Sequence, residues 1–236
     1  MDDKNETYEI FIKEFMVLRQ KLISVFILFF AGSAIGLLFN QQILKLALKI
    51  FNFSGVNMVL TSPGQMIEIS IYTAVLTGLF FATPVLIYQI YMYIRPAFKD
   101  KEYHLIMSFV PLSLVLFILG GAFGVWINQL MLALFSKFSS DFRLNNIWDL
   151  QRFFSQVIMT AILTGLLFQM PLFLSALIRF RLLSRQLLVQ KRKVAYVILL
   201  IIAVLLPPTD ILSLLILTIP LILLYELTLF LNVGQP

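Results

Sequence analysis

Three polar side chains interrupt long apolar runs in this chain of 236 residues: Glu68, Gln169 and Glu226. A carboxylate or an amide is costly in hydrocarbon, so such a group faces protein or water and marks a functional site or a helix contact. For Gln169 and Glu226, contact with a partner protein and packing inside the chain are equally favoured. Glu68 stands near the end of its apolar run, which favours a water-facing position.

Covalent or metal chemistry has few candidate residues. The chain has no cysteine and a single histidine, His104, which stands alone in a basic loop. A metal site needs a cluster of ligands, and a serine hydrolase needs a base paired with its nucleophile. The sequence contains no such cluster or pair, and no glycine loop of the kind that binds phosphate. We therefore expect neither an enzyme nor a metal or cofactor site.

The composition indicates whether the chain folds in water or in a lipid bilayer. Hydrophobic residues make up 60% of the chain and charged residues 13%, whereas soluble domains have about 45–50% and about 25%. The mean hydropathy is +0.95. The sequence therefore predicts an all-α, polytopic integral membrane protein with one membrane domain. Nucleic acid is not expected as a partner, because the bases behind the net charge of +6 lie in short loops beside apolar runs.

The apolar runs predict six transmembrane helices at about residues 22–39, 64–93, 103–126, 153–178, 194–206 and 211–231. A preceding amphipathic stretch, residues 5–21, is expected to lie on the membrane surface as a helix. Residues 40–63 and 128–150 are expected outside the bilayer, the second as short capping helices.

Prolines mark two positions within these spans. Pro84 removes a backbone donor from the second span and predicts a kink there, with Thr83 available to satisfy the freed carbonyl. Pro207 and Pro208 end the fifth span early, so that span is expected to be short.

The distribution of basic residues predicts the orientation of the chain. Residues 1–21 hold four bases, residues 94–101 hold three and residues 179–193 hold six without an acid, whereas residues 40–63 hold two and residues 128–152 hold three. Lys and Arg are enriched in cytoplasmic loops. Both termini are therefore expected on the cytoplasmic side, or on the matrix or stromal side in an organelle. The corner at residues 82–102, where an apolar span breaks into a short charged loop, is expected on that side too.

Five stretches, taken together and in order, resemble one family: LTSPGQ, TPVLIYQIYMYIRPAFKDKE, FQMP, LPPTD and PLILLYE. The chain is similar over nearly its whole length to TatC, the receptor subunit of the twin-arginine protein translocase. The resemblance implies a concave arrangement of six helices and a role in the export of folded proteins. It also implies, as partners, twin-arginine signal peptides and small single-span TatA/TatB-like subunits in an oligomeric assembly in the lipid bilayer.

The resemblance also assigns roles to residues. TatC-like proteins bind the signal peptide with an acid that follows the proline of the first cytoplasmic loop, which matches Glu102 after Pro96. Guanidinium groups prefer bidentate carboxylate partners, which suits this role. Tyr93 and Pro96 are expected to shape the pocket, and Arg19 matches the arginine of the family's N-terminal region.

Further roles are implied within the membrane. Gln169 and Glu226 are expected to contact a single-span partner. Pro84, Pro207 and Asp210 are assigned structural and gating roles, and Pro207 and Asp210, together with Glu226, are expected to hold the fifth and sixth spans in place.

The chain departs from the family pattern at three positions that are acidic in relatives: Val17, Gln65 and Gln169. The nearest acid to Val17 is Glu14, about one helical turn upstream, and it is the candidate second carboxylate for the signal peptide. The two amides keep hydrogen bonding and lose charge.

Location and two alternative functions follow from composition and from the polar residues. The 23 phenylalanines and the absence of cysteine favour the mitochondrial inner membrane, with a bacterial inner membrane or a thylakoid as alternatives. An ion-coupled secondary transporter would use Glu68 and Glu226 as a proton relay. An accessory subunit of a respiratory complex would use the glycine-bearing and aromatic spans for packing alone.

Overall fold

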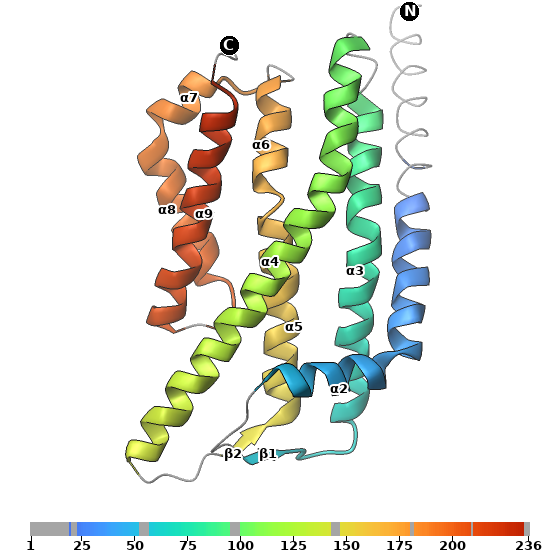
Figure 1. Ribbon diagram of the computed structural model, residues 1–236, viewed down its shortest axis with the longest axis vertical. Coiled ribbons are helices and arrows are strands. Elements are labelled where there is room, and N and C mark those ends of the chain that lie inside the picture. The colour runs from blue at the N-terminus through green and yellow to red at the C-terminus, as the bar shows by residue number, and fades with distance from the viewer. Residues whose placement is uncertain are drawn as a thin grey trace, which may run out of the picture.

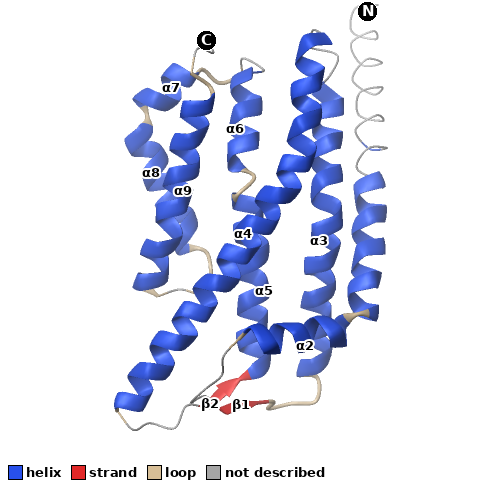
Figure 2. Cartoon of the chain, in the orientation of Figure 1, coloured by secondary structure: helices blue, strands red, loops and turns tan. Residues whose placement is uncertain are grey.

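The structure is a computed structural model in which most of the described chain is helical (Figures 1 and 2). It describes residue 19 and residues 23–51, 57–94, 100–142, 147–179, 182–208 and 210–233. The side chains of residues 47, 50, 90–94, 100–110 and 140 are outside this description. The described helices are Ile23–Leu38, α2 Asn40–Ile50, α3 Gln65–Ile94, α4 Asp100–Asp141, α5 Leu150–Leu167, α6 Met170–Arg179, α7 Arg185–Gln190, α8 Arg192–Val204 and α9 Ile211–Leu231. The strands are β1 Asn57–Val59 and β2 Ile147–Asp149.

Four stretches of the described chain are long and apolar enough to cross a membrane: Gln65–Gln89, Pro111–Ser139, Leu150–Arg179 and Ile211–Leu231. The helices Ile23–Leu38 and Asn40–Leu46 meet at a bend of 70°, and they form a fifth such stretch if they are counted as one span. The helix α8 has 13 residues, or ~20 Å, and is as short as expected for this position. The predicted all-α, multi-pass membrane fold is confirmed, while the number of six spans and the side of the termini stay predictions.

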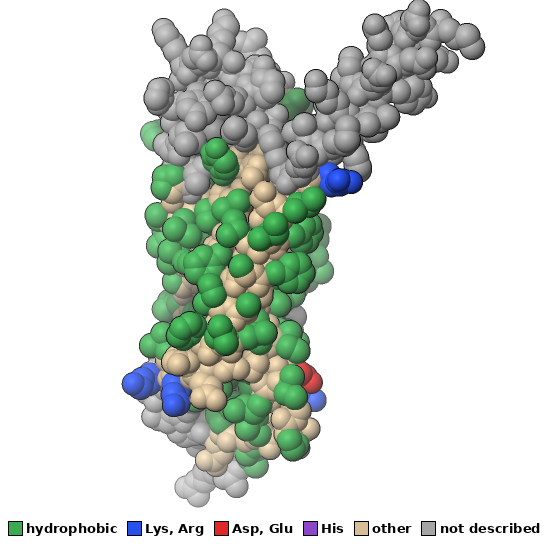
Figure 3. Space-filling model, turned by 90° about the vertical axis from the view of Figure 1, so that its right-hand side faces the viewer, with side chains coloured by type: hydrophobic (Ala, Val, Ile, Leu, Met, Phe, Trp, Pro, Cys, Tyr) green, Lys and Arg blue, Asp and Glu red, His purple; other side chains and the backbone are tan. Residues whose placement is uncertain are grey.

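The long helices run along the main axis of the molecule, and α4 crosses the others obliquely (Figure 1). The helix Ile23–Leu38 begins, and α9 ends, toward the same end of the molecule, whereas α2 lies across the opposite end (Figure 1). One face shows a band of apolar side chains with charged side chains above and below it (Figure 3). This distribution suits a protein whose middle is surrounded by lipid.

Glycines allow two pairs of helices to approach closely. A Cβ atom on Gly36 would lie 2.9 Å from the Cα atom of Ala74 on α3. A Cβ atom on Gly120 of α4 would lie 2.6 Å from the carbonyl oxygen of Thr164 on α5. Small residues at such contacts strengthen helix packing in membranes, where no hydrophobic effect drives helices together. Gly36 therefore allows the helix Ile23–Leu38 to lie close to α3.

The helix α4 extends past Trp126 to Asp141, so the prediction of short capping helices over residues 128–150 is wrong. The apolar side of this helix continues beyond Trp126, because Ile127, Met131 and Leu132 are almost fully buried. Packing on that side maintains the helix where the sequence shows a mixed polar segment.

A cap forms at the end where α2 lies. There β1 and β2 pair in parallel, with Met58 opposite Trp148. Beneath them, the ring of Phe51 packs edge-on against the ring of Phe153 with their centroids 5.0 Å apart, in a buried cluster with Phe154. The predicted outer segments are thus joined to each other and to the start of α5.

Pro84 lies inside α3, which continues through it. The hydroxyl of Thr83 donates to the carbonyl oxygen of Leu79 at 2.7 Å, and not to the carbonyl of Phe80 that Pro84 leaves without its helical donor. A threonine in a helix bonds back to the carbonyl four residues earlier, which explains the difference from the prediction. The kink at Pro84 stays a prediction.

Candidate functional site

Gln169 lies at the break between α5 and α6. The break precedes Pro171, which has no N–H group to continue the helical bonds. The amide nitrogen of Gln169 donates to the carbonyl oxygen of Ser113 on α4 at 3.1 Å and to that of Gly165 at 3.3 Å. Its oxygen Oε1 is buried and has no hydrogen-bond partner among the described residues. The side chain of Gln169 therefore connects the break between α5 and α6 to α4, and its oxygen Oε1 accepts no hydrogen bond from the described residues.

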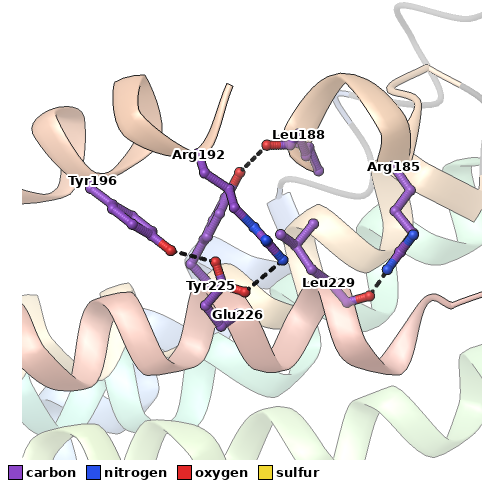
Figure 4. A network of polar contacts seen from close by, with 7 residues as sticks. All are labelled: Arg185, Leu188, Arg192, Tyr196, Tyr225, Glu226 and Leu229. Carbon is purple, nitrogen blue, oxygen red and sulfur yellow. Dashed lines mark hydrogen bonds and ion pairs between the residues drawn. The ribbon is translucent and has the colours of Figure 1, made fainter. Parts of the chain in front are cut away.

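Glu226 on α9 is paired with α8 (Figure 4). Its oxygen Oε2 accepts a hydrogen bond from Nη2 of Arg192 at 2.9 Å, and its oxygen Oε1 accepts one from the hydroxyl of Tyr196 at 2.5 Å. Both carboxylate oxygens thus hold α9 against α8, as a structural role for this residue requires. Contact of Glu226 with a partner protein stays a prediction.

Two further hydrogen bonds fix α7 on α9 beside this pair (Figure 4). The guanidinium Nε of Arg185 donates to the carbonyl oxygen of Leu229 at 3.0 Å. The hydroxyl of Tyr225 donates to the carbonyl oxygen of Leu188 at 2.9 Å. The side chain of Arg185 satisfies a carbonyl near the C-terminal end of α9, where cations are favoured.

Asp210 and Pro207 lie in the turn between α8 and α9. Asp210 is the N-cap of α9, and its carboxylate accepts from the backbone N–H of Ser213 at 2.8 Å and from its hydroxyl at 2.6 Å. The carbonyl oxygen of Pro207 accepts from the hydroxyl of Thr160 on α5 at 2.8 Å. These bonds fix the turn to α5, and the gating role of this region stays a prediction.

A chain of polar side chains inside the helical bundle was not predicted from the sequence. The amide of Gln156 on α5 donates to the side-chain oxygen of Asn128 on α4 at 3.0 Å. Thr160 and Thr164 follow on the same face of α5, and both are almost fully buried. The four-residue spacing of Gln156, Thr160 and Thr164 was the available signal, since such residues share one face of a helix.

A second polar cluster joins the cap to α3. The amide of Gln65 donates to Oδ2 of Asp149 at 2.8 Å, and the hydroxyl of Thr61 donates to the same atom at 2.8 Å. Asp149 is also the N-cap of α5 and accepts from the backbone N–H of Arg152 at 3.0 Å. These donors, the Arg152 N–H first, lower the pKa of Asp149 to about 2.

Glu68 lies one turn further along α3 from this cluster. It is exposed, as expected, and accepts a hydrogen bond from the amide of Gln151 at 2.6 Å. This bond gives α3 and α5 a second polar link near the cap.

The residues expected to bind a signal peptide are only partly covered by the structure. Glu14 and Pro96 lie outside the described residues. Tyr93 lies in the last turn of α3 and Glu102 in the first turn of α4, with both side chains outside the description. Arg19 is exposed. The ends of α3 and α4 lie side by side at the end of the molecule away from the cap (Figure 1).

Several apolar helices, small-residue contacts and bonded polar groups within them define a multi-pass membrane protein. The family model described as Sec-independent protein translocase protein (TatC) matches residues 14–220. The chain therefore belongs to the TatC family of protein translocase components, which favours translocation over the transporter and respiratory-subunit alternatives.

Individual relatives agree with this assignment. The chain is 33% identical to the Sec-independent protein translocase protein TatCy of Bacillus subtilis (strain 168) over 67% of its own length and 63% of that protein's. It is 28% identical to TatC of Listeria innocua over 89% of its own length and 86% of the relative's. A crystal structure described as the twin-arginine translocase receptor TatC superposes with a TM-score of 0.79 at 27% identity, covering 93% of this chain and 97% of the other.

Proposed function

We propose that this chain binds the twin-arginine signal peptides of folded cargo and nucleates the site at which that cargo crosses the membrane. The observation that carries the proposal is the position of Glu102 in the first turn of α4, beside the end of α3. The positive end of a helix dipole favours a carboxylate in its ionised form, ready to pair with arginine. Similarity to proteins described as twin-arginine translocase receptors supports the same function.

The recognition surface would combine Glu102 with the N-terminal region. Tyr93 and Pro96 would shape the pocket, Arg19 would orient the N-terminal segment, and Glu14 would supply a second carboxylate. A bidentate pair of a guanidinium and a carboxylate is stronger and geometrically more specific than a single hydrogen bond. This explains how a site without covalent chemistry distinguishes paired arginines from lysines.

Export of a twin-arginine precursor tests this proposal in cells that depend on this chain for transport. Removing one partner of a desolvated charge pair costs about 2–5 kcal/mol, so Glu102→Ala should slow export by at least roughly tenfold. Glu68→Ala is the matched control, since Glu68 is an exposed acid near the opposite end. Normal export by a Glu102→Ala protein that accumulates at the usual level would refute the proposal.

We propose further that Gln169 receives a single-span TatA/TatB-like partner. Its buried Oε1 lacks a hydrogen-bond partner among the described residues, so a donor from another helix would satisfy it. Gln169→Leu should weaken partner binding, measured by co-purification, while Gln169→Glu should retain it. Thr164→Val, which changes a buried polar group bonded within α5, is the control. Equal co-purification with Gln169→Leu and the parent chain would contradict the contact.

Location in the mitochondrial inner membrane is also proposed, on composition alone. The relatives described above are from Bacillus and Listeria, and a bacterial inner membrane is the alternative. Fractionation of the source cells with an antibody to this chain distinguishes the two. Recovery outside purified mitochondria would refute the proposed location.

A further inference from the structure

The basic segment at residues 179–193 has no part in the translocase function proposed above. Two of its described cations are used inside the chain, since Arg185 bonds to Leu229 and Arg192 pairs with Glu226. Lys191 and Lys193 differ from them. Both are exposed, and neither side chain forms an ion pair with any described residue. Two free cations therefore remain at one end of α8.

These lysines stand at the top of the apolar outer face of α8. Lys193, Val197 and Ile201 are spaced by four and share one side of the helix. Val197 is 57% exposed and Ile201 is 54% exposed, so this side contacts no other described element over most of its area. An apolar stripe that ends in a lysine matches an acyl chain that ends in a charged headgroup.

The preceding segment adds exposed apolar side chains. Leu182 is 71% exposed and Leu187 is 48% exposed, and the carbonyl oxygen of Leu187 accepts from the backbone N–H of Lys191 at 2.9 Å. The helix α7 that carries Leu187 is fixed to α9 by the Arg185 and Tyr225 bonds described above (Figure 4). Exposed leucines on a segment held at a membrane surface insert among headgroups and upper acyl chains.

We propose that Lys191 and Lys193, with Leu182 and Leu187, form a binding site for an anionic phospholipid. The headgroup phosphate would pair with the two lysines, and an acyl chain would lie along Val197 and Ile201. An acidic protein segment would also pair with lysines, but it would leave the apolar stripe below them uncovered. The continuity of cations with an exposed apolar face therefore favours lipid.

The opposite end of the molecule offers a matched comparison. Lys45 and Lys49 on α2 are also exposed and lie beside the exposed Leu46. Among the described side chains, the acids Glu68, Asp141 and Asp149 are exposed or half-exposed at that end, whereas Glu226, the acid of α9 that faces α8, is already paired with Arg192. The two pairs of lysines therefore differ in the charged side chains that surround them.

The experiment uses the full chain in mild detergent and native mass spectrometry. Phosphatidylglycerol and phosphatidylcholine are titrated against the parent chain, against Lys191→Gln/Lys193→Gln and against Lys45→Gln/Lys49→Gln. Each basic residue near an anionic headgroup contributes a free energy that corresponds to a several-fold change in affinity. We expect the first variant to bind phosphatidylglycerol roughly tenfold to thirtyfold more weakly. We expect unchanged binding by the second variant, and weak, lysine-independent binding of phosphatidylcholine.

Three results would overturn the proposal. Equal losses in both lysine variants would show a response to total charge, and no loss in either would remove the site. Displacement of phosphatidylglycerol by a soluble hexaglutamate peptide at equal concentration would assign the surface to an acidic protein segment. A third variant, Leu182→Ser/Leu187→Ser, keeps every charge and should also weaken phosphatidylglycerol binding. Circular dichroism on each variant checks that the fold is retained.

Discussion

The side-chain amide of Gln65 donates a hydrogen bond of 2.8 Å to the carboxylate of Asp149, 84 positions away in the chain. The resemblance to TatC proteins predicts an acid at position 65, where this chain has an amide. The structure gives this departure a physical reason. A carboxylate at position 65 would face the carboxylate of Asp149, whereas an amide donates to it.

Gln65→Glu should lower the thermal stability of the protein at neutral pH. The substitution removes the N–H donor and brings two carboxylates together at the cap. The loss should shrink at mildly acidic pH, because one proton shared by the pair relieves the repulsion. Thermal unfolding at pH 7 and pH 4.5 measures this loss of stability. Gln65→Ala is the control, because it removes the hydrogen bond without adding charge. A loss that is equal for both substitutions at both pH values would contradict this account.

Asp149→Asn should remove a stability contribution that depends on pH. The pKa of Asp149 in the folded protein is lowered to about 2, below the ordinary value of about 3.9. A lowered pKa contributes stability that is fully present above about pH 4 and is lost as the pH falls toward 2. The melting temperatures of parent and variant should therefore differ most above pH 4 and converge near pH 2. A difference that grows on acidification would have the wrong sign.

Gly124→Ala should destabilise the protein, whereas Gly121→Ala should not. A Cβ atom on Gly124 would lie 2.5 Å from the hydroxyl of Thr164 and 3.1 Å from the Cα atom of Ala161. On Gly121 the nearest such neighbour is 3.6 Å away, an ordinary contact. Overpacking costs about 1–3 kcal/mol, while alanine gains about 1 kcal/mol of helix propensity over glycine. Unfolding in detergent by a chemical denaturant compares the two neighbours directly.

Thr160→Val should loosen the turn between α8 and α9. The hydroxyl of Thr160 is almost fully buried and is the donor to the Pro207 carbonyl. Leaving that carbonyl without a partner costs about 1–3 kcal/mol. Hydrogen exchange at Ile211 to Ser213, where α9 begins, should accelerate in the variant. Thr218→Val, whose hydroxyl bonds only to its own helix, is the control that should leave this exchange unchanged.

Local features of the sequence predicted most of the helices, because apolar runs and prolines are visible over a few residues. The proline pair correctly marked the break before α9, whereas the break between α5 and α6, just before Pro171, lies inside the predicted span 153–178 and was not predicted. The pairing of β1 with β2 was not predictable, since it joins segments about 90 positions apart with ordinary compositions. The extension of α4 past Trp126 was missed because Asn128 and Gln129 indicated the end of the span, although the exposed Leu134 and Phe138 continue its apolar composition.

The same distinction applies to the candidate site. The polarity of Gln169 and Glu226 could be recognised in the sequence, but their partners could not. Arg192 is 34 positions from Glu226, and Ser113 is 56 positions from Gln169. Only folding brings such groups into contact, so the sequence indicated which residues need a partner and the structure shows which partner each has.

The parallel pairing of β1 with β2 has a mechanical consequence. It ties the chain leading into α3 to the chain leading into α5, and the Gln65–Asp149 and Glu68–Gln151 bonds reinforce the tie within two turns of each helix. Two helices that are connected at one end can separate only by rotating about that end. Any separation of α3 from α5 would therefore be greatest toward the far end of α3, the end of the molecule where Tyr93 and Glu102 lie, and least beside the strands.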